Sequence, residues 1–133
     1  MPQSALASAL PQITQVVEPT PPLEVLIIDD QSTARDILAA IVLTIDPRTR
    51  VHKFGHPAKA LMWAASNEVD FVLTDLRMPA MDGVEVIRRL RALPHCEAIP
   101  MVVVTILDDK QIRYSALEAG ATEFLNKPLD KHE

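Results

Sequence analysis

The sequence predicts an α/β domain built on a parallel β-sheet. Five short segments have the composition of strands, and segments with helical spacing of apolar residues lie between them. Three of the strand segments are continuous apolar runs, which is typical of strands buried on both faces of a parallel sheet. Strands that alternate with helices form α/β folds, so the order along the chain favours this class.

The five strand segments follow one another along residues 25–125. The three apolar runs are Val25–Ile28, Phe71–Thr74 and Met101–Val104. Apolar and polar residues alternate in Val51–Phe54, as expected of an edge strand. The last segment is Thr122–Leu125, directly before Asn126 and Lys127.

Four helices are predicted between the strands, because apolar residues recur there at spacings of three and four. The apolar stripes consist of Ala34, Ile37, Leu38, Ile41 and Ile45, of Leu61, Ala64 and Ala65, of Val86, Ile87, Leu90 and Leu93, and of Ile112, Ser115, Ala116 and Ala119. Ser32 is a candidate cap of the first helix, and Asp108 or Asp109 of the last. Pro57 suits a first helical turn, and Gly120 suits a helix end.

Composition limits the classes of function. The chain has 133 residues, of which 48% are hydrophobic and 23% charged, as expected of one globular domain. Its net charge of −5 argues against direct binding to nucleic acid. The single cysteine, Cys96, can form no internal disulfide, and no apolar run approaches the roughly 20 residues that span a membrane. We therefore expect a cytoplasmic protein that contacts neither nucleic acid nor membrane.

The first 22 residues differ from the rest of the chain. They contain five of the eleven prolines and one charged residue, Glu18. Such a composition is typical of a flexible segment, so we expect a Pro/Ala-rich tail over 1–22 and the folded domain over 23–133. The alternative is a partner-binding arm with a short helix over Leu6–Val17.

Charged or hydroxyl-bearing residues stand at the carboxyl ends of four of the five predicted strands. Asp29 and Asp30 follow the first strand, Asp75 the third and Thr105 the fourth, while Lys127 follows the fifth. In an open α/β sheet these carboxyl ends meet at one edge, which is where ligands bind. Crowded carboxylates favour a hard divalent cation such as Mg²⁺. The cation, the lysine and the hydroxyl together suit a phosphoryl group.

These residues stand in blocks that resemble the signature blocks of the response-regulator receiver domain. The blocks are Leu26–Asp30, Leu73–Gly83 with its sequence L-T-D-L-R-M-P-A-M-D-G, Val104-Thr105, and Asn126–Pro128. The resemblance covers about residues 23–130. It implies a flavodoxin-like, doubly wound sheet of five parallel strands in the order 2-1-3-4-5.

The resemblance also implies a metal site. Asp30 and Asp75 would bind Mg²⁺ directly, with the backbone carbonyl of Arg77 as the third protein ligand. Asp29 would act largely through metal-bound water. Pro79 and Gly83 would shape the loop after Asp75.

The resemblance implies a signalling switch at the same site. Asp75 would be the phosphoacceptor, and Lys127 would contact the phosphoryl oxygens or, without phosphate, Asp75. Thr105 would hydrogen-bond the phosphoryl group, and Phe124 would be the switch aromatic residue. The Lys127–Pro128 peptide bond would be cis.

The function implied is control of a partner by phosphorylation. A sensor histidine kinase or phosphotransfer protein of a two-component phosphorelay would phosphorylate Asp75. The surface formed by the helix after Asp109 and the last strand would then change, with Tyr114 and Leu117 as candidate contacts, and control an output domain or partner protein. The domain would be no enzyme beyond its own phosphorylation and dephosphorylation. The alternative is an interaction module with the same fold that works without phosphorylation.

Two further expectations concern the output and the end of the chain. The stretches Phe54–Pro57 and Thr105-Ile106 resemble receivers joined to HD-GYP cyclic di-GMP phosphodiesterase domains. Only Leu129–Glu133 remain where the family has its last helix, so we expect that helix to be missing or cut. The surfaces expected to lose cover, and to favour self-association, are Leu26 or Ile27, Phe124 or Leu125, and the flank of the first helix.

Overall fold

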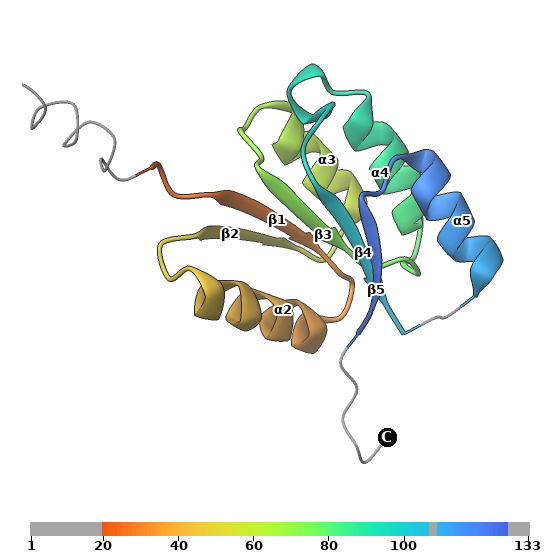
Figure 1. Cartoon of the computed structure of the whole chain (residues 1–133), viewed down its shortest axis with the longest axis horizontal. Helices are drawn as coiled ribbons and strands as arrows, with labels where there is room; N and C mark the ends of the chain where they lie inside the picture. The colour runs from red at the N-terminus through yellow and green to blue at the C-terminus, as the bar shows by residue number, and fades with distance from the viewer. Residues whose placement is uncertain (1–19, 107–108, 128–133) are drawn as a thin grey trace, which may run out of the picture.

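The computed structural model describes residues 20–106 and 109–127, which form a five-stranded parallel sheet flanked by helices (Figure 1). The strands are β1 (Glu24–Ile28), β2 (Arg50–Phe54), β3 (Phe71–Thr74), β4 (Met101–Thr105) and β5 (Glu123–Asn126). The helices are α2 (Ser32–Ile45), α3 (Pro57–Ala65), α4 (Gly83–Arg91) and α5 (Lys110–Ala119), with a 3₁₀ turn at Pro94–Cys96. The sheet order is β2-β1-β3-β4-β5, which confirms the predicted topology.

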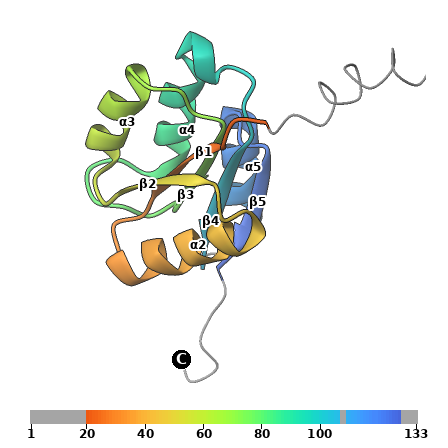
Figure 2. The same ribbon diagram turned by 90° about the vertical axis from the view of Figure 1, so that its left-hand side faces the viewer.

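Helices cover the sheet on both faces. Figures 1 and 2 show α2 on one face and α3, α4 and α5 on the other. The two-residue period of β1 distributes its side chains accordingly. Leu26 and Ile28 belong to the larger core cluster under α3, α4 and α5, while Val25 and Ile27 pack with Leu38 of α2. Leu26 and Ile27 are both fully buried, so the expectation that one of them loses cover is wrong.

The apolar stripe of α2 is only partly buried. Leu38 faces the sheet, whereas Ile37, Ile41 and Ile45 are 46%, 44% and 81% exposed. Leu125 of β5 is also exposed, while its neighbour Phe124 is buried. Among the described residues, no element other than the sheet strands packs extensively against α2. The expected last helix, the Lys127–Pro128 bond and most of the tail (1–19) lie outside the described residues.

Local signals set the helix ends. Asp109 caps α5 by accepting hydrogen bonds from Gln111 N and Ile112 N, and Gly120 ends that helix with a φ of 116°, as predicted. Ser32 is not the cap of α2, contrary to the prediction; it is the first helical residue, and the preceding Gln31 makes no side-chain cap.

No helix within residues 20–106 and 109–127 is long and apolar enough to cross a membrane.

Arg91, at the end of α4, fastens three segments at the amino edge of the sheet. Its Nε and Nη2 donate to the carbonyl of Gly120 at 3.0 and 2.8 Å, and its Nη1 donates to the carbonyls of Ile99 and Cys96 at 2.6 and 3.0 Å. A Cβ at Gly120 would lie 3.0 Å from Arg91 Cγ, so the glycine lets the two segments approach closely. The end of α5 and the entry to β4 thus depend on one guanidinium group.

We therefore expect Arg91→Ala to lower the free energy of unfolding by about 2–4 kcal/mol, because it leaves several partly buried carbonyls without their charged donor. Urea unfolding measures this. Arg88→Ala on the same helix is the control: among the described residues, Arg88 forms an exposed ion pair with Glu85, and its loss should cost less than about 1 kcal/mol. Equal losses in the two variants would contradict a structural role for the Arg91 contacts.

Candidate functional site

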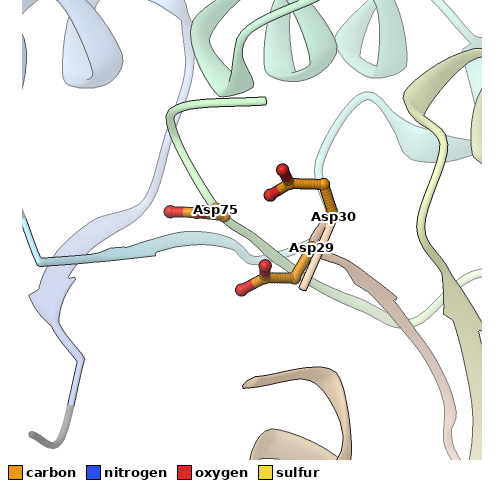
Figure 3. Close-up of side chains that lie close together, drawn as sticks. All are labelled: Asp29, Asp30 and Asp75. Carbon is orange, nitrogen blue, oxygen red and sulfur yellow. The ribbon is translucent and has the colours of Figure 1, made fainter. Parts of the chain in front are cut away.

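Three carboxyl groups meet at the carboxyl edge of the sheet. Ile28 of β1 pairs with Thr74 of β3, so the residues that follow them, Asp29 and Asp75, leave neighbouring strands at the same level. Asp75 N also donates to Ile28 O at 2.8 Å. Each of Asp29, Asp30 and Asp75 contributes a carboxylate oxygen to a group within 4.8 Å, and Figure 3 shows the three side chains pointing in the same direction.

Asp29 is the most buried of the three. Its side chain has no exposed surface, and its Oδ1 accepts a hydrogen bond from Gln31 N at 3.0 Å. Its Oδ2 lies 2.8 Å from Lys127 Nζ. That contact is a close, charge-assisted ion pair, and a carboxylate oxygen has a second lone pair that can accept a further hydrogen bond. Asp29 therefore carries a buried oxygen that could still accept a hydrogen bond from another ligand, such as a metal-bound water.

Asp75 is held in place by its backbone surroundings. Its Oδ1 accepts a hydrogen bond from Leu76 N at 2.7 Å, and its Oδ2 lies 3.2 Å from Lys127 Nζ. Gly83 packs so closely on this segment that a Cβ there would overlap the Asp75 carbonyl. Burial raises the pKa of Asp75, although the Leu76 hydrogen bond and the charge of Lys127 oppose the change.

Lys127 bridges the two buried carboxylates. It follows β5, and its N–H donates to Thr105 O at 2.8 Å, which places it beside the end of β4. Burial alone would lower the pKa of Lys127, but Asp29 and Asp75 outweigh burial and raise it. The ammonium group is therefore positively charged at neutral pH.

The donor set fits a divalent cation. Three carboxylates share one ammonium group, which leaves negative charge uncompensated among oxygen ligands. Asp30 is exposed and makes no hydrogen bond or ion pair within residues 20–106 and 109–127, so its carboxylate is available. Hard cations such as Mg²⁺ prefer such oxygen ligands and keep several waters.

The other predicted site residues take positions compatible with their expected roles, which stay predictions. Thr105 is buried at the end of β4, and Phe124 is buried in β5, with the Arg113 guanidinium 5.3 Å from its ring centroid. Tyr114 and Leu117 are 67% and 45% exposed on α5. The Arg77 side chain is exposed on the loop after β3.

Sequence reasoning missed Arg35 of α2. Its Nη1 donates to the backbone carbonyl of Asp29 at 2.6 Å. The partner is a backbone atom, so no pattern of residue types signals the contact. The spacing is the only available sign, since Arg35 lies in the first turn of the helix that begins at Ser32, two residues after the acid pair.

Comparison with known proteins agrees with this geometry. The sequence model of the response regulator receiver domain matches residues 25–133. The cyclic di-GMP phosphodiesterase response regulator RpfG of Xanthomonas campestris pv. campestris is 46% identical over 111 residues, which cover 84% of this chain and 29% of RpfG. The response regulator PleD of Caulobacter vibrioides is 45% identical over 71 residues, or 53% of this chain and 16% of PleD.

Solved structures share the fold. The chemotaxis protein CheY4 of Vibrio cholerae superposes with a TM-score of 0.75 over 82% of this chain and 89% of that chain, at 23% identity. The chain spans less than a third of the length of RpfG and of PleD. The similarity therefore concerns one domain of those proteins.

The raised pKa of Asp75 makes stability depend on pH. Its contribution is present in full below about pH 4, the ordinary aspartate pKa, and is lost as the pH rises through the raised value. In EDTA at pH 7, Asp75→Asn should therefore unfold at a higher urea concentration than the wild type, and the difference should shrink toward pH 4. Asp36→Asn, an exposed ion-pair partner of Lys53, is the control. A less stable Asp75→Asn at pH 7 would contradict the assignment.

Proposed function

The chain belongs to the family of response-regulator receiver domains, and we propose that it accepts a phosphoryl group at Asp75. The family places it in two-component signalling, where the receiver is a regulatory domain. One observation carries the residue assignment: Asp29, Asp30 and Asp75 converge with Lys127 at the carboxyl edge of the sheet. Asp29 and Asp75 are both buried beside Lys127, but the Asp29 side chain has no exposed surface, whereas the Asp75 side chain keeps 9%, so a donor can reach Asp75.

The proposed metal site uses the acid cluster. Asp30 and Asp75, with the backbone carbonyl of Arg77, would hold Mg²⁺, and Asp29 would act through a metal-bound water. When bound, the cation neutralises charge on the phosphoryl oxygens. The burial of Asp29 beside Lys127, within 4.8 Å of the other two carboxylates, supports its part in this arrangement.

The proposed reaction is transfer of a phosphoryl group from a phosphohistidine. A carboxylate oxygen of Asp75 attacks phosphorus, the P–N bond breaks as the O–P bond forms, and the departing imidazole keeps the electron pair. Lys127 Nζ, 3.2 Å from Asp75 Oδ2, balances charge on the transferred group. The Thr105 hydroxyl would donate to a phosphoryl oxygen once the acyl phosphate has formed.

The proposed readout is the surface of α5 and β5. Thr105 and Phe124 lie on adjacent strands, since Val103 pairs with Phe124 and Thr105 with Asn126. A movement of Thr105 toward the phosphoryl group would therefore reach the Phe124 side chain. Tyr114 and Leu117, exposed on α5, are the proposed partner contacts. The domain would promote only its own phosphorylation and dephosphorylation, with a sensor histidine kinase or phosphotransfer protein as donor.

Acetyl phosphate with Mg²⁺ should add the mass of one phosphoryl group to the full chain. Asp75→Asn should stay unmodified. EDTA should prevent the addition, because acetyl phosphate is an anion and the three carboxylates repel it unless a divalent cation neutralises their charge. Intact-protein mass spectrometry measures both. Asp36→Asn, on the exposed surface of α2, should be phosphorylated like the wild type. Phosphorylation of Asp75→Asn to the wild-type extent would contradict the proposal.

The similarity to RpfG supports a proposal about the output. We infer that phosphorylation of this receiver controls hydrolysis of cyclic di-GMP, either in its own protein or in a partner. In the native host, Asp75→Asn should change the cellular cyclic di-GMP concentration at least twofold, and Asp36→Asn should not. An unchanged concentration, with the variant expressed at the wild-type level, would remove this output from consideration.

A further inference from the structure

The turn that presents the acid pair is held by three hydrogen bonds. Asp29 N donates to Phe54 O of β2 at 3.1 Å, and Gln31 N donates to Asp29 Oδ1 at 3.0 Å. Arg35 Nη1 donates to Asp29 O at 2.6 Å. Only the Arg35 bond comes from a side chain outside the turn, and it acts on the carbonyl directly before Asp30.

That carbonyl controls how Asp30 is presented. The C=O of Asp29 and the N–H of Asp30 belong to one planar peptide unit, so a bond that fixes the carbonyl fixes the plane. The Asp30 side chain is exposed and forms no hydrogen bond or ion pair in the described part of the chain. Its direction toward Asp29 and Asp75 therefore depends on the backbone that Arg35 holds.

Gly55 makes room for this bond. A Cβ at Gly55 would lie 2.7 Å from Arg35 Nη1 and 3.3 Å from Arg35 Cζ. The crowded atoms are the end of a flexible side chain, so Gly55→Ala would displace the guanidinium group while the backbone stays in place. Asp30, Arg35 and Gly55 line one open cavity of about 410 Å³ together with His56 and Pro79.

We propose that Arg35 is a positioning residue for the acid site, and that Gly55 is the position that permits it. The hydrogen bond from Arg35 to Asp29 O orients the Asp29–Asp30 peptide so that the Asp30 carboxylate converges with the other two. The expected loss of Mg²⁺ affinity without this hydrogen bond rests on the proposed function, whereas the expected gain in mobility of the Asp30 backbone does not.

A purely electrostatic role for Arg35 predicts the opposite effect on metal binding. A nearby guanidinium repels a divalent cation, so its removal would tighten Mg²⁺ binding. A positioning role predicts weaker binding when the hydrogen bond is lost. High salt reduces the electrostatic effect, because the Debye length at 1 M is about 3 Å.

The test is an NMR titration of the full chain with Mg²⁺ at high salt, with ¹⁵N relaxation of the Asp30 amide in EDTA. Gly55→Ala and Arg35→Ala should each raise the Mg²⁺ dissociation constant about three- to tenfold, the equivalent of one hydrogen bond. Both should lower the order parameter of the Asp30 amide. Arg35→Lys keeps a donor and should stay within about twofold of the wild type. Lys53→Ala removes an equal charge from β2 without touching Asp29 and is the control.

The double variant separates this proposal from a general effect of the alanine at Gly55. In the Arg35→Ala background, Gly55→Ala should have no further effect, because the guanidinium that it displaces is absent. Equal effects of Gly55→Ala in both backgrounds would overturn the proposal, and so would an unchanged Asp30 order parameter in Arg35→Ala. Failure of the wild type to bind Mg²⁺ would overturn the proposed metal site, while the relaxation data would still decide the role of Arg35.

Discussion

The ammonium group of Lys127 lies between two buried carboxylates, 2.8 Å from Asp29 Oδ2 and 3.2 Å from Asp75 Oδ2. Buried carboxylates destabilise a fold unless a cation or hydrogen bonds compensate them, so the edge of the sheet depends on this contact. One ammonium group cannot neutralise three carboxylates. The remaining charge makes the site receptive to a divalent cation and then to a phosphoryl group, so the contact that stabilises the resting edge also prepares it for chemistry.

The acid cluster lies at the carboxyl edge of the sheet, whereas the Arg91 contacts lie at the amino edge. Arg91 connects α4, α5 and the segment before β4 at the opposite edge, through five hydrogen bonds to four backbone carbonyls. At the carboxyl edge, the side chains that follow β1, β3, β4 and β5 converge, because the parallel register ends these strands at the same height in the sheet. Under the proposed function, a signal that begins at Asp75 would move Thr105 and the surface of α5 while the amino edge stays in place. The exposed apolar flank of α2, formed by Ile37, Ile41 and Ile45, is a separate surface.

Most of the fold and the acid cluster could be predicted from sequence, because both depend on patterns that repeat along the chain. Apolar runs mark the buried strands, and the acidic residues that follow them converge once the strands are parallel. The cap of α2 could not be predicted from Ser32, because residue type does not reveal where a helix begins after a sharp turn. The exposed flank of α2 was predicted, whereas the full burial of Leu26 and Ile27 was not, since it depends on how the helices and neighbouring strands pack against β1. Arg35 was missed because its partner is a backbone carbonyl.

The central claim is that Asp75, among three adjacent carboxylates, receives the phosphoryl group. Borohydride reduces an acyl phosphate to an alcohol and converts the modified aspartate to homoserine, which peptide mass spectrometry can locate. After treatment of the full chain with acetyl phosphate and Mg²⁺, we expect homoserine at residue 75 and aspartate at residues 29 and 30. Homoserine at 29 or 30, or at none of the three in a chain that had gained phosphate, would contradict the account.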